Sequence, residues 1–113
     1  MSDCIFCKII NKEIPSTVIY EDDKILAFND LEPQAPAHCL IVTKKHIESL
    51  DEITSEDTEL VGYLITKVKD IASVLGIENG YRLVNNCGDD AQQTVKHLHF
   101  HLLGKRRMVW PPG

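Results

Sequence analysis

Three of the five histidines stand at alternating positions, in the segment His97-Leu98-His99-Phe100-His101. On a β-strand, side chains two residues apart point to the same face and lie about 6.5–7 Å apart. A helix would scatter the imidazoles around its axis and leave the neighbouring apolar residues without a stripe. Apart from Lys96, the residues between and around the histidines are apolar: Val95, Leu98, Phe100 and Leu102. The spacing therefore predicts a strand with one core face and three imidazoles along the other.

Electrostatics indicates what three neighbouring imidazoles can do. Two imidazolium charges about 7 Å apart repel by about 2 kcal/mol at an effective dielectric constant near 20, which is more than one pKa unit. We therefore expect at least one ring to be neutral near pH 7. A neutral ring is a nucleophile or a metal ligand, and a protonated neighbour binds an anion or donates a proton. The alternative, ordinary histidines on a half-exposed sheet face, fits one histidine better than three in alternation.

Length, composition and charge exclude several classes of protein. The 113 residues fit one domain, 1–113, with the composition of an ordinary globular protein, 43% hydrophobic and 26% charged. A formal charge of −5 argues against binding along nucleic acid backbones. We expect a cytoplasmic protein, because no apolar run reaches the ~20 residues of a membrane span and no signal segment stands at the amino terminus. The four cysteines are then expected to be thiols or metal ligands.

Periodicity predicts an α+β fold with an antiparallel sheet. β-rich runs indicate strands over 18–20, 25–28, 39–42 and 81–85, in addition to the histidine strand. A short helix is expected over 4–10, with Asp3 as its cap. One long helix is expected between the caps Thr54 and Ser55 and the stop at Gly76. Its apolar positions are Leu60, Val61, Leu64, Ile65, Val68, Ile71, Ala72 and Leu75.

Two further segments carry groups that bind anions or metals. The polar loop over 86–94 leads into the histidine strand, so amides near Gly88 and the donors Gln93 and Thr94 could surround an oxyanion. The alternative is an ordinary turn. Cys4 and Cys7 are three residues apart, so on a helix both sulfurs could bind one metal, with distant histidines as the remaining zinc ligands. The alternative is two reduced thiols that pack as small apolar groups.

Taken together, these residues resemble the histidine triad family, specifically its Hint branch. The resemblance extends from Cys4 to the carboxyl end and rests first on the alternating histidines with the apolar residues after them, 97–103. The flanking segments that agree are Ile14-Pro15-Ser16, Glu21-Asp22-Asp23, Gln34-Ala35-Pro36-Ala37-His38, Lys44-Lys45-His46-Ile47, Gly80-Tyr81-Arg82 and Trp110-Pro111-Pro112-Gly113. In one loop the chain departs from the family, because Ala91-Gln92 stands where two glycines are common.

The resemblance implies a purine nucleoside phosphoramidase, which cleaves the P–N bond of an adenosine or guanosine 5′-monophosphoramidate. His99 would attack the α-phosphorus to form a nucleotidyl-histidine, and water would then release AMP or GMP. His38, His97 and His101 would surround the phosphate. Asn86, Gly88, Gln93 and Thr94 would bind its oxygens or relay the proton. Two alternatives are a dinucleoside polyphosphate hydrolase and a nucleotide-binding regulatory or adaptor module, and a third is a metalloenzyme with an open zinc site at the histidines.

The family pattern also implies a nucleoside site and a metal site. Asp30, beside Asn29, would accept hydrogen bonds from the ribose hydroxyls. The base would lie between Ile5, Phe6, Ile9, Phe28 and Leu31. The alternative is that Ile5, Ile9 and Phe28 are simply core residues. Some relatives bind zinc with residues that correspond to Cys4, Cys7, His46 and His97. Such a zinc ion would be structural, closed by four protein ligands, and would hold the amino-terminal helix on the sheet.

The resemblance further implies a histidine triad fold with a five-stranded antiparallel sheet that continues across a two-fold homodimer. In the family, the carboxyl-terminal tail reaches toward the partner's active site. Trp110 would therefore influence which leaving group is accepted. The alternative is that Trp110 docks on its own subunit, since an indole at a chain end must either pack or remain exposed.

Overall fold

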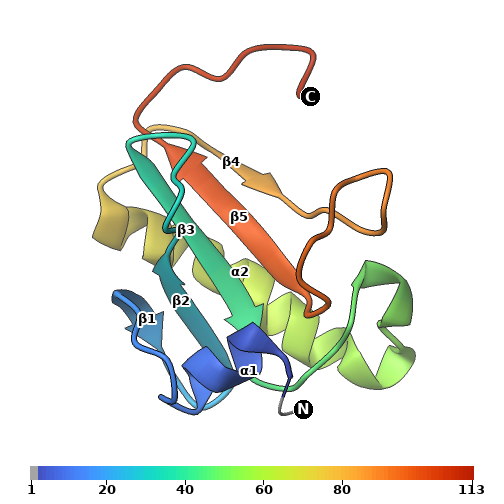
Figure 1. Cartoon of the computed structure of the whole chain (residues 1–113). Helices are drawn as coiled ribbons and strands as arrows, with labels where there is room; N and C mark the ends of the chain where they lie inside the picture. Colours follow the sequence, from blue (N-terminus) through green and yellow to red (C-terminus); the bar gives the residue numbers. More distant parts are fainter. Residues whose placement is uncertain (1–2) are drawn as a thin grey trace.

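A five-stranded antiparallel sheet lies at the centre of the structure, a computed structural model that describes residues 3–113 (Figure 1). The strand order is β1-β2-β3-β5-β4. One helix precedes the first strand, and a second helix follows β3 after two 3₁₀ turns, at Leu50–Glu52 and Ser55–Asp57. The strands are β1 (Val18–Glu21), β2 (Ile25–Asn29), β3 (Ala37–Thr43), β4 (Tyr81–Val84) and β5 (His99–Gly104), and the helices are α1 (Ile5–Ile10) and α2 (Thr58–Leu75). The predicted fold class is confirmed.

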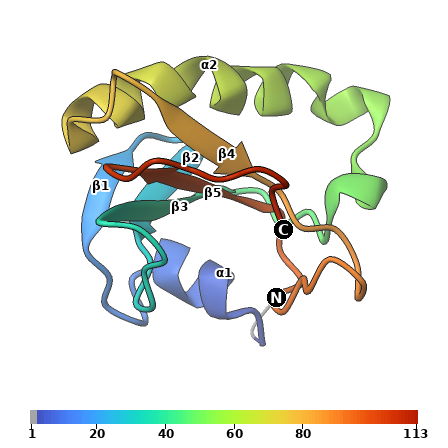
Figure 2. The same ribbon diagram turned by 90° about the horizontal axis from the view of Figure 1, so that it is seen from above.

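Helices cover both faces of this sheet (Figure 2). The long helix α2 packs on one face over a core that includes Ile41, Phe100 and Leu102. The short helix α1 packs on the other face, where Phe6 and Ile9 meet apolar side chains of β2 and β3. Because β3 lies between the two layers, all seven of its residues are buried. Cys39 is one of these buried residues.

The long helix α2 begins later than its caps suggested. Thr54 and Asp57 form a reciprocal capping box around a 3₁₀ turn, and the α-helix starts at Thr58. It ends at Gly76, which adopts φ 74° as its left-handed cap. Its buried residues are Leu64, Val68, Ile71 and Ala72. Ile65 lies in this helix as predicted, and it is 44% exposed because it lies beside the stripe that faces the sheet.

Helix α1 is capped by Cys4. The sequence had suggested Asp3 as the cap, and that prediction was wrong. The backbone N–H of Cys7 donates to the Sγ of Cys4 at 3.4 Å. A cysteine at the cap turns its sulfur back over the first turn of the helix. The two sulfurs are therefore brought to the same end of α1.

The histidine strand is shorter than predicted, because β5 begins at His99. The N–H of His97 donates to the carbonyl of Val95 at 2.9 Å, so the chain bends just before the strand. This bend places Val95 on the α1 side of the sheet, where the alternation had assigned it to the opposite face. Leu98, Phe100 and Leu102 lie in the core under α2, as predicted. The bend also removes His97 from the row of imidazoles.

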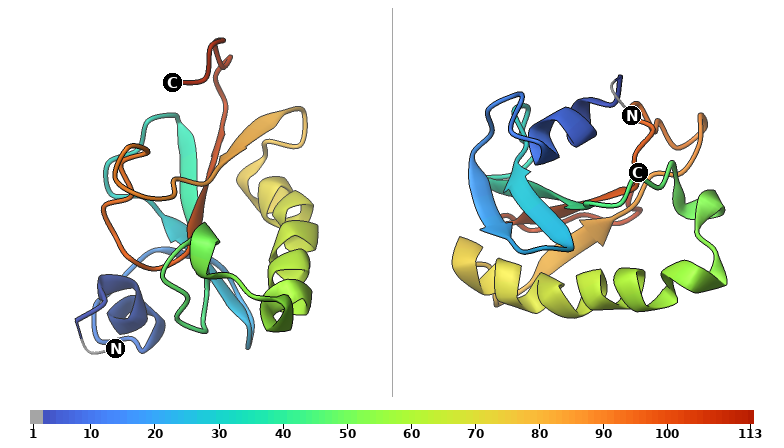
Figure 3. Two further views of the ribbon diagram at one scale, coloured as in Figure 1. Left: turned by 90° about the vertical axis from the view of Figure 1, so that its right-hand side faces the viewer. Right: turned by 90° about the horizontal axis from the view of Figure 1, so that it is seen from below.

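The carboxyl-terminal segment extends away from the sheet after β5 (Figure 3). The Nη1 of Arg82, on β4, donates to the carbonyl of Val109 at 3.1 Å, and the guanidinium lies 5.9 Å from the ring centroid of Trp110. Even so, Trp110 is 80% exposed. No helix within residues 3–113 is long and apolar enough to cross a membrane.

Candidate active site and metal cluster

A cavity of about 520 Å³ opens on the α1 face of the sheet. It lies between α1, the end of β2, the start of β5 and the loop that precedes β5. Eleven of the residues proposed from the sequence line it: Ile5, Phe6, Ile9, Phe28, Asn29, Asp30, Leu31, Asn86, Thr94, His99 and His101. The lining also includes residues that the sequence did not single out as a site, among them Ile14, Pro15, Ser16 and Gln92.

The apolar end of this cavity is formed by two aromatic rings and the α1 side chains. Phe6 and Phe28 pack edge to face, with ring centroids 5.6 Å apart. Ile5 and Leu31 are exposed at the rim, and Asp30 stands where β2 ends. A slot between apolar groups with a carboxylate at its edge matches the chemistry of a nucleoside, a flat base attached to a sugar with hydroxyl groups.

The His99 ring is fixed in one tautomer by a backbone carbonyl. Its Nδ1 lies 2.6 Å from the carbonyl oxygen of His97. Because a carbonyl accepts and cannot donate, Nδ1 must carry the proton, and Nε2 of the neutral ring keeps its lone pair. This Nε2 has no hydrogen-bond partner among residues 3–113 and is accessible to solvent. The lone pair is therefore available for attack on a ligand in the cavity.

His38 and His101 form a second hydrogen-bonded arrangement, and His101 lines the cavity. The backbone N–H of Gln34 donates to Nδ1 of His38 at 2.9 Å, so a neutral His38 carries its proton on Nε2. That nitrogen lies 2.9 Å from Nδ1 of His101, which must accept. His101 in turn keeps its proton on Nε2. Asp30 lies 3.4 Å from Nε2 of His38 and competes for the same proton.

Burial keeps the cavity histidines neutral. Burial lowers the pKa of His99 and of His38, in both cases against the raising effect of the Asp30 carboxylate. Burial, together with the charges of His99 and His38, lowers the pKa of His101 to about 4. Near pH 7 these rings are therefore neutral. His99 is a lone-pair donor and His101 is an N–H donor.

The imidazole of His97 lies in a separate cluster with Cys4, Cys7 and His46. This ring is 0% exposed, and its Nε2 donates to the carbonyl of Thr43 at 2.8 Å, which leaves Nδ1 without a proton. Nδ1 of His97 lies 3.3 Å from the Cys4 sulfur, 3.7 Å from the Cys7 sulfur and 3.1 Å from Nδ1 of His46. The prediction that three imidazoles share one strand face was therefore wrong for His97. The ring of His97 does not reach the cavity. His97 acts on the cavity only through its carbonyl, which accepts from Nδ1 of His99.

The cluster has the dimensions of a tetrahedral metal site. All four donor atoms lie within 4.8 Å of one another. A zinc ion with bonds near 2.0–2.3 Å would place its ligands about 3.3–3.8 Å apart, close to the distances in this cluster. Burial and the neighbouring Cys4 raise the pKa of Cys7, so its thiol needs a cation to ionise. Two sulfurs and two imidazole nitrogens are a donor set typical of zinc. The cluster is compatible with zinc.

Five residues proposed from the sequence for the substrate site lie outside the cavity lining: His38, His97, Gly88, Gln93 and Trp110. Gln93 is buried and donates from Nε2 to the carbonyls of Glu48 and Val95, and its Oε1 accepts from the N–H of Gly88. Gln93 and Gly88 therefore hold the loop together, and their bonded groups are not directed at a ligand. Trp110 lies on the extended tail. Gln92 does line the cavity, with a backbone φ of 62° that glycine adopts more easily.

Comparison with known proteins agrees with this geometry. Residues 11–108 match the HIT domain family. The chain is 51% identical to an uncharacterized HIT-like protein of Synechocystis, over 98% of this chain and 97% of that protein. It is also 51% identical to a 14 kDa zinc-binding protein of Zea mays, over 99% of this chain and 89% of that protein. The crystal structure of a HIT family hydrolase from Legionella pneumophila superposes with a TM-score of 0.95, at 48% identity over 98% of this chain and 100% of that one.

Proposed function

This chain belongs to the HIT domain family, and from that premise we propose that it is a purine nucleoside phosphoramidase with His99 as its nucleophile. The single observation that carries the proposal is the tautomer of His99. The carbonyl of His97 holds the ring proton on Nδ1, so the Nε2 lone pair is available beside the apolar slot. A neutral, oriented imidazole is a good nucleophile toward phosphorus.

The proposed reaction has two displacements at the α-phosphorus. In the first, the Nε2 lone pair of His99 forms an N–P bond while the P–N bond to the amine breaks. The departing amine takes a proton from Nε2–H of His101 or from the Thr94 hydroxyl, both of which line the cavity. In the second, water attacks the phosphorus and returns a proton to the group that protonated the amine, while the bond to His99 breaks. This step releases the nucleoside monophosphate and restores the lone pair on His99.

The substrate would lie with its base in the apolar slot and its phosphate beside β5. Phe6, Phe28 and Ile9 supply the apolar contacts for a purine, and Asp30 is placed to accept from the ribose hydroxyls. Asn86 and Thr94 stand at the polar end of the same cavity and offer donors to the phosphate oxygens.

We also propose that Cys4, Cys7, His46 and His97 bind one structural zinc ion. Bound zinc would supply four bonds that fix α1 against the sheet, with no open position for a substrate. Two observations support this proposal. The four donor atoms lie close together, and the Thr43 carbonyl holds the ring proton of His97 on Nε2, so that Nδ1 is free to bind a metal. A hydrogen bond of this kind orients a ligating imidazole.

A two-fold homodimer is the remaining part of the proposal. β4 is an edge strand that pairs only with β5 among the described strands, so its outer edge is available for a second copy. The exposed Trp110 lies on the tail held beside this strand by Arg82. Sheets joined through the β4 edges would bring the tail of one subunit close to the other subunit.

Trapping the covalent intermediate tests the proposed function. The protein is mixed with adenosine 5′-phosphoramidate, quenched at short times and analysed by mass spectrometry. We expect a mass increase of one adenylyl group on the peptide that contains His99, and none in a His99→Ala variant. A nucleotide-binding module would show no adduct. A dinucleoside polyphosphate hydrolase would form it faster from diadenosine polyphosphate than from the phosphoramidate.

A further inference from the structure

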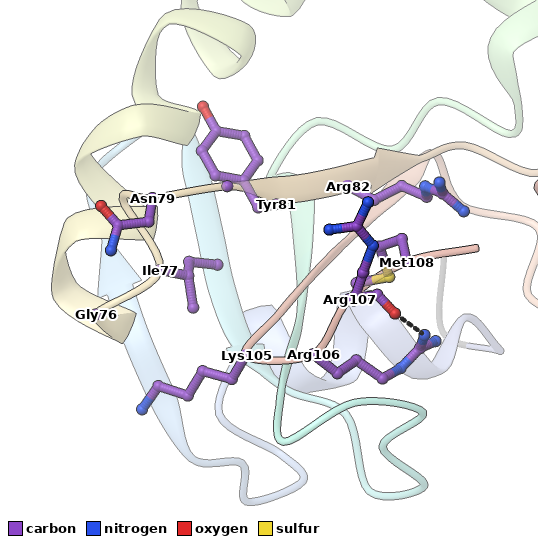
Figure 4. A pocket seen from close by; sticks show the side chains of 10 residues that line it. Gly76, Ile77, Asn79, Tyr81, Arg82, Lys105, Arg106, Arg107 and Met108 are labelled. Carbon is purple, nitrogen blue, oxygen red and sulfur yellow. Dashed lines mark hydrogen bonds between the residues drawn. The ribbon is translucent and has the colours of Figure 1, made fainter. Parts of the chain in front are cut away.

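Four cationic side chains line a groove at the far end of β5, yet they do not form one anion site. The groove is bounded by Arg82, Lys105, Arg106 and Arg107 (Figure 4). The Lys105 ammonium turns toward Gly76 and lies 3.9 Å from where a Cβ of that glycine would stand, at the end of α2 where a cation is favourable. Arg82 holds the Val109 carbonyl on the tail. Lys105 and Arg82 therefore have separate partners, and the four cations do not form one site.

Arg106 is the member of this group that reaches the active-site side. Its Nε donates to the carbonyl of Gln34 at 3.0 Å, across 72 residues of sequence, and its Nη1 lies 3.4 Å from the carbonyl of Arg107. One guanidinium therefore joins the loop between β2 and β3 to the segment that follows β5. An arginine suits this role because its planar fork offers several donors in fixed directions.

Gln34, the loop residue that accepts from Arg106, also sets the tautomers of His38 and His101. The carbonyl of Gln34 accepts a hydrogen bond from Nε of Arg106, and the N–H of Gln34 donates to Nδ1 of His38. His38 then donates to Nδ1 of His101 at 2.9 Å. The series of donors runs in one direction from Arg106 to His101. It ends at Nε2–H of His101, a lining residue of the cavity.

We propose that Arg106 is a positioning residue, which holds Gln34 so that His38 stays in its Nε2–H tautomer and His101 presents its Nε2–H to the cavity. The catalytic consequence rests on the proposed function, because it concerns the proton that the leaving amine receives. The effect of Arg106 on the tautomers of His38 and His101 does not depend on the proposed function. Without Arg106 the loop loses its tie to the β5 extension, and Nδ1 of His38 is free to take a proton beside Asp30.

Nitrogen-15 NMR of the imidazole rings tests the effect directly on the full chain as purified. In the wild type we expect His38 and His101 to show a protonated Nε2 and an unprotonated Nδ1. In Arg106→Ala, both Nδ1 shifts of this pair should move toward values averaged over two forms. Arg107→Ala is the matched control, since it removes the same charge from a side chain that makes no hydrogen bond or ion pair within residues 3–113. Unchanged rings in Arg106→Ala, or equal changes in both variants, would overturn the proposal.

Kinetics with adenosine 5′-phosphoramidate then tests the consequence. We expect Arg106→Ala to lower kcat about tenfold with KM within about twofold, because the donor is misplaced while the base slot is intact. Arg106→Lys, which keeps one donor, should recover part of the loss. In a His38→Ala background, Arg106→Ala should add nothing, and an independent further loss there would overturn the route through His38. A wild type without turnover would reject the phosphoramidase and leave the ring result standing.

Discussion

Phe6 stands edge-on against the ring of His99, with the two centroids 5.0 Å apart and an angle of 84° between the planes. Phe6 belongs to α1, a helix of six residues that is too short to be stable by itself. The same helix carries Cys4 at its cap and Cys7 in its first turn, both of which belong to the proposed zinc site. The cluster and the wall of the active-site cavity are therefore coupled through α1.

This coupling predicts the effect of removing the metal. Chelator-free protein should contain about one zinc ion per chain, and Cys4→Ala should lose it because three ligands bind weakly. We expect the melting temperature to fall by roughly 10 °C, since a structural metal contributes several kcal/mol to folding. Nucleotide affinity should fall with it, because Phe6 is no longer fixed. Elemental analysis, thermal melting and calorimetry measure the three quantities.

Cys87→Ala provides the matched control for this variant. Cys87 is a half-buried cysteine on the loop before β5, outside the metal cluster. The zinc content should therefore stay at one ion per chain and the melting temperature should change little. Well-folded, metal-free wild-type protein would refute the zinc proposal without affecting the assignment of His99.

Replacing the nucleophile should separate chemistry from binding. We expect His99→Ala to reduce phosphoramidate hydrolysis at least about a thousandfold while the Kd for AMP stays within about tenfold. The base slot keeps the side chains of Phe6, Phe28 and Ile9 in this variant, although Phe6 loses its contact with the His99 ring. Steady-state kinetics and isothermal calorimetry measure the two effects. Hydrolysis at the wild-type rate would mean that another group, or a metal-bound water, attacks the phosphorus.

Local pattern was sufficient to predict most of the fold. β-rich runs located β1, β2 and β4 to within about one residue, and helical periodicity with Gly76 located α2. Where the prediction failed, the cause lies in tertiary contacts. The N–H of Leu98 donates to the carbonyl of Ile47 at 2.6 Å, and because of this contact with a distant loop the strand begins only at His99. Alternation within the histidine segment contains no information about that loop.

The site was predictable in its residue types and less so in its hydrogen bonds. The sequence indicated a cysteine pair and alternating histidines, but it assigned the ring of His97 to the phosphate as well as to the metal. The role of Gln34 depends on its backbone N–H and carbonyl, which every residue except proline offers. No side-chain pattern could have identified it. Cytoplasmic location and the homodimer stay predictions.

A partly buried carboxylate, Asp22, predicts how stability depends on pH. Burial by itself would raise its pKa, but hydrogen bonds from Tyr63, from the N–H groups of Lys24 and Ile25, and from Tyr20 outweigh it and lower the pKa to about 2. The ordinary value is 3.8. The unfolded chain therefore binds the proton first as pH falls. The stabilisation is complete above about pH 4 and is lost as the pH falls through 2.

The variant Asp22→Asn measures this contribution. Near pH 6 it should lower the free energy of unfolding by about 1 kcal/mol, a modest value because solvent screens a partly exposed carboxylate. By pH 3 about half of the difference from the wild type should be gone. Urea unfolding at a series of pH values gives the difference. Asp23→Asn, at an exposed neighbouring carboxylate, is the matched control. A difference between Asp22→Asn and the wild type that does not depend on pH would contradict the assignment to Asp22.

The loop beside the cavity stores backbone strain at Gln92. Its φ of 62° costs a residue with a Cβ about 1 kcal/mol or more, a cost that glycine avoids. Gln92→Gly should therefore raise the free energy of unfolding by about 0.5 kcal/mol, after the greater entropy of glycine in the unfolded chain is subtracted. Ala91→Gly, next to it and without a positive φ, should only lower stability. Urea unfolding of both variants measures the pair of effects. Equal destabilisation by the two glycines would show that the left-handed turn at Gln92 is unstrained.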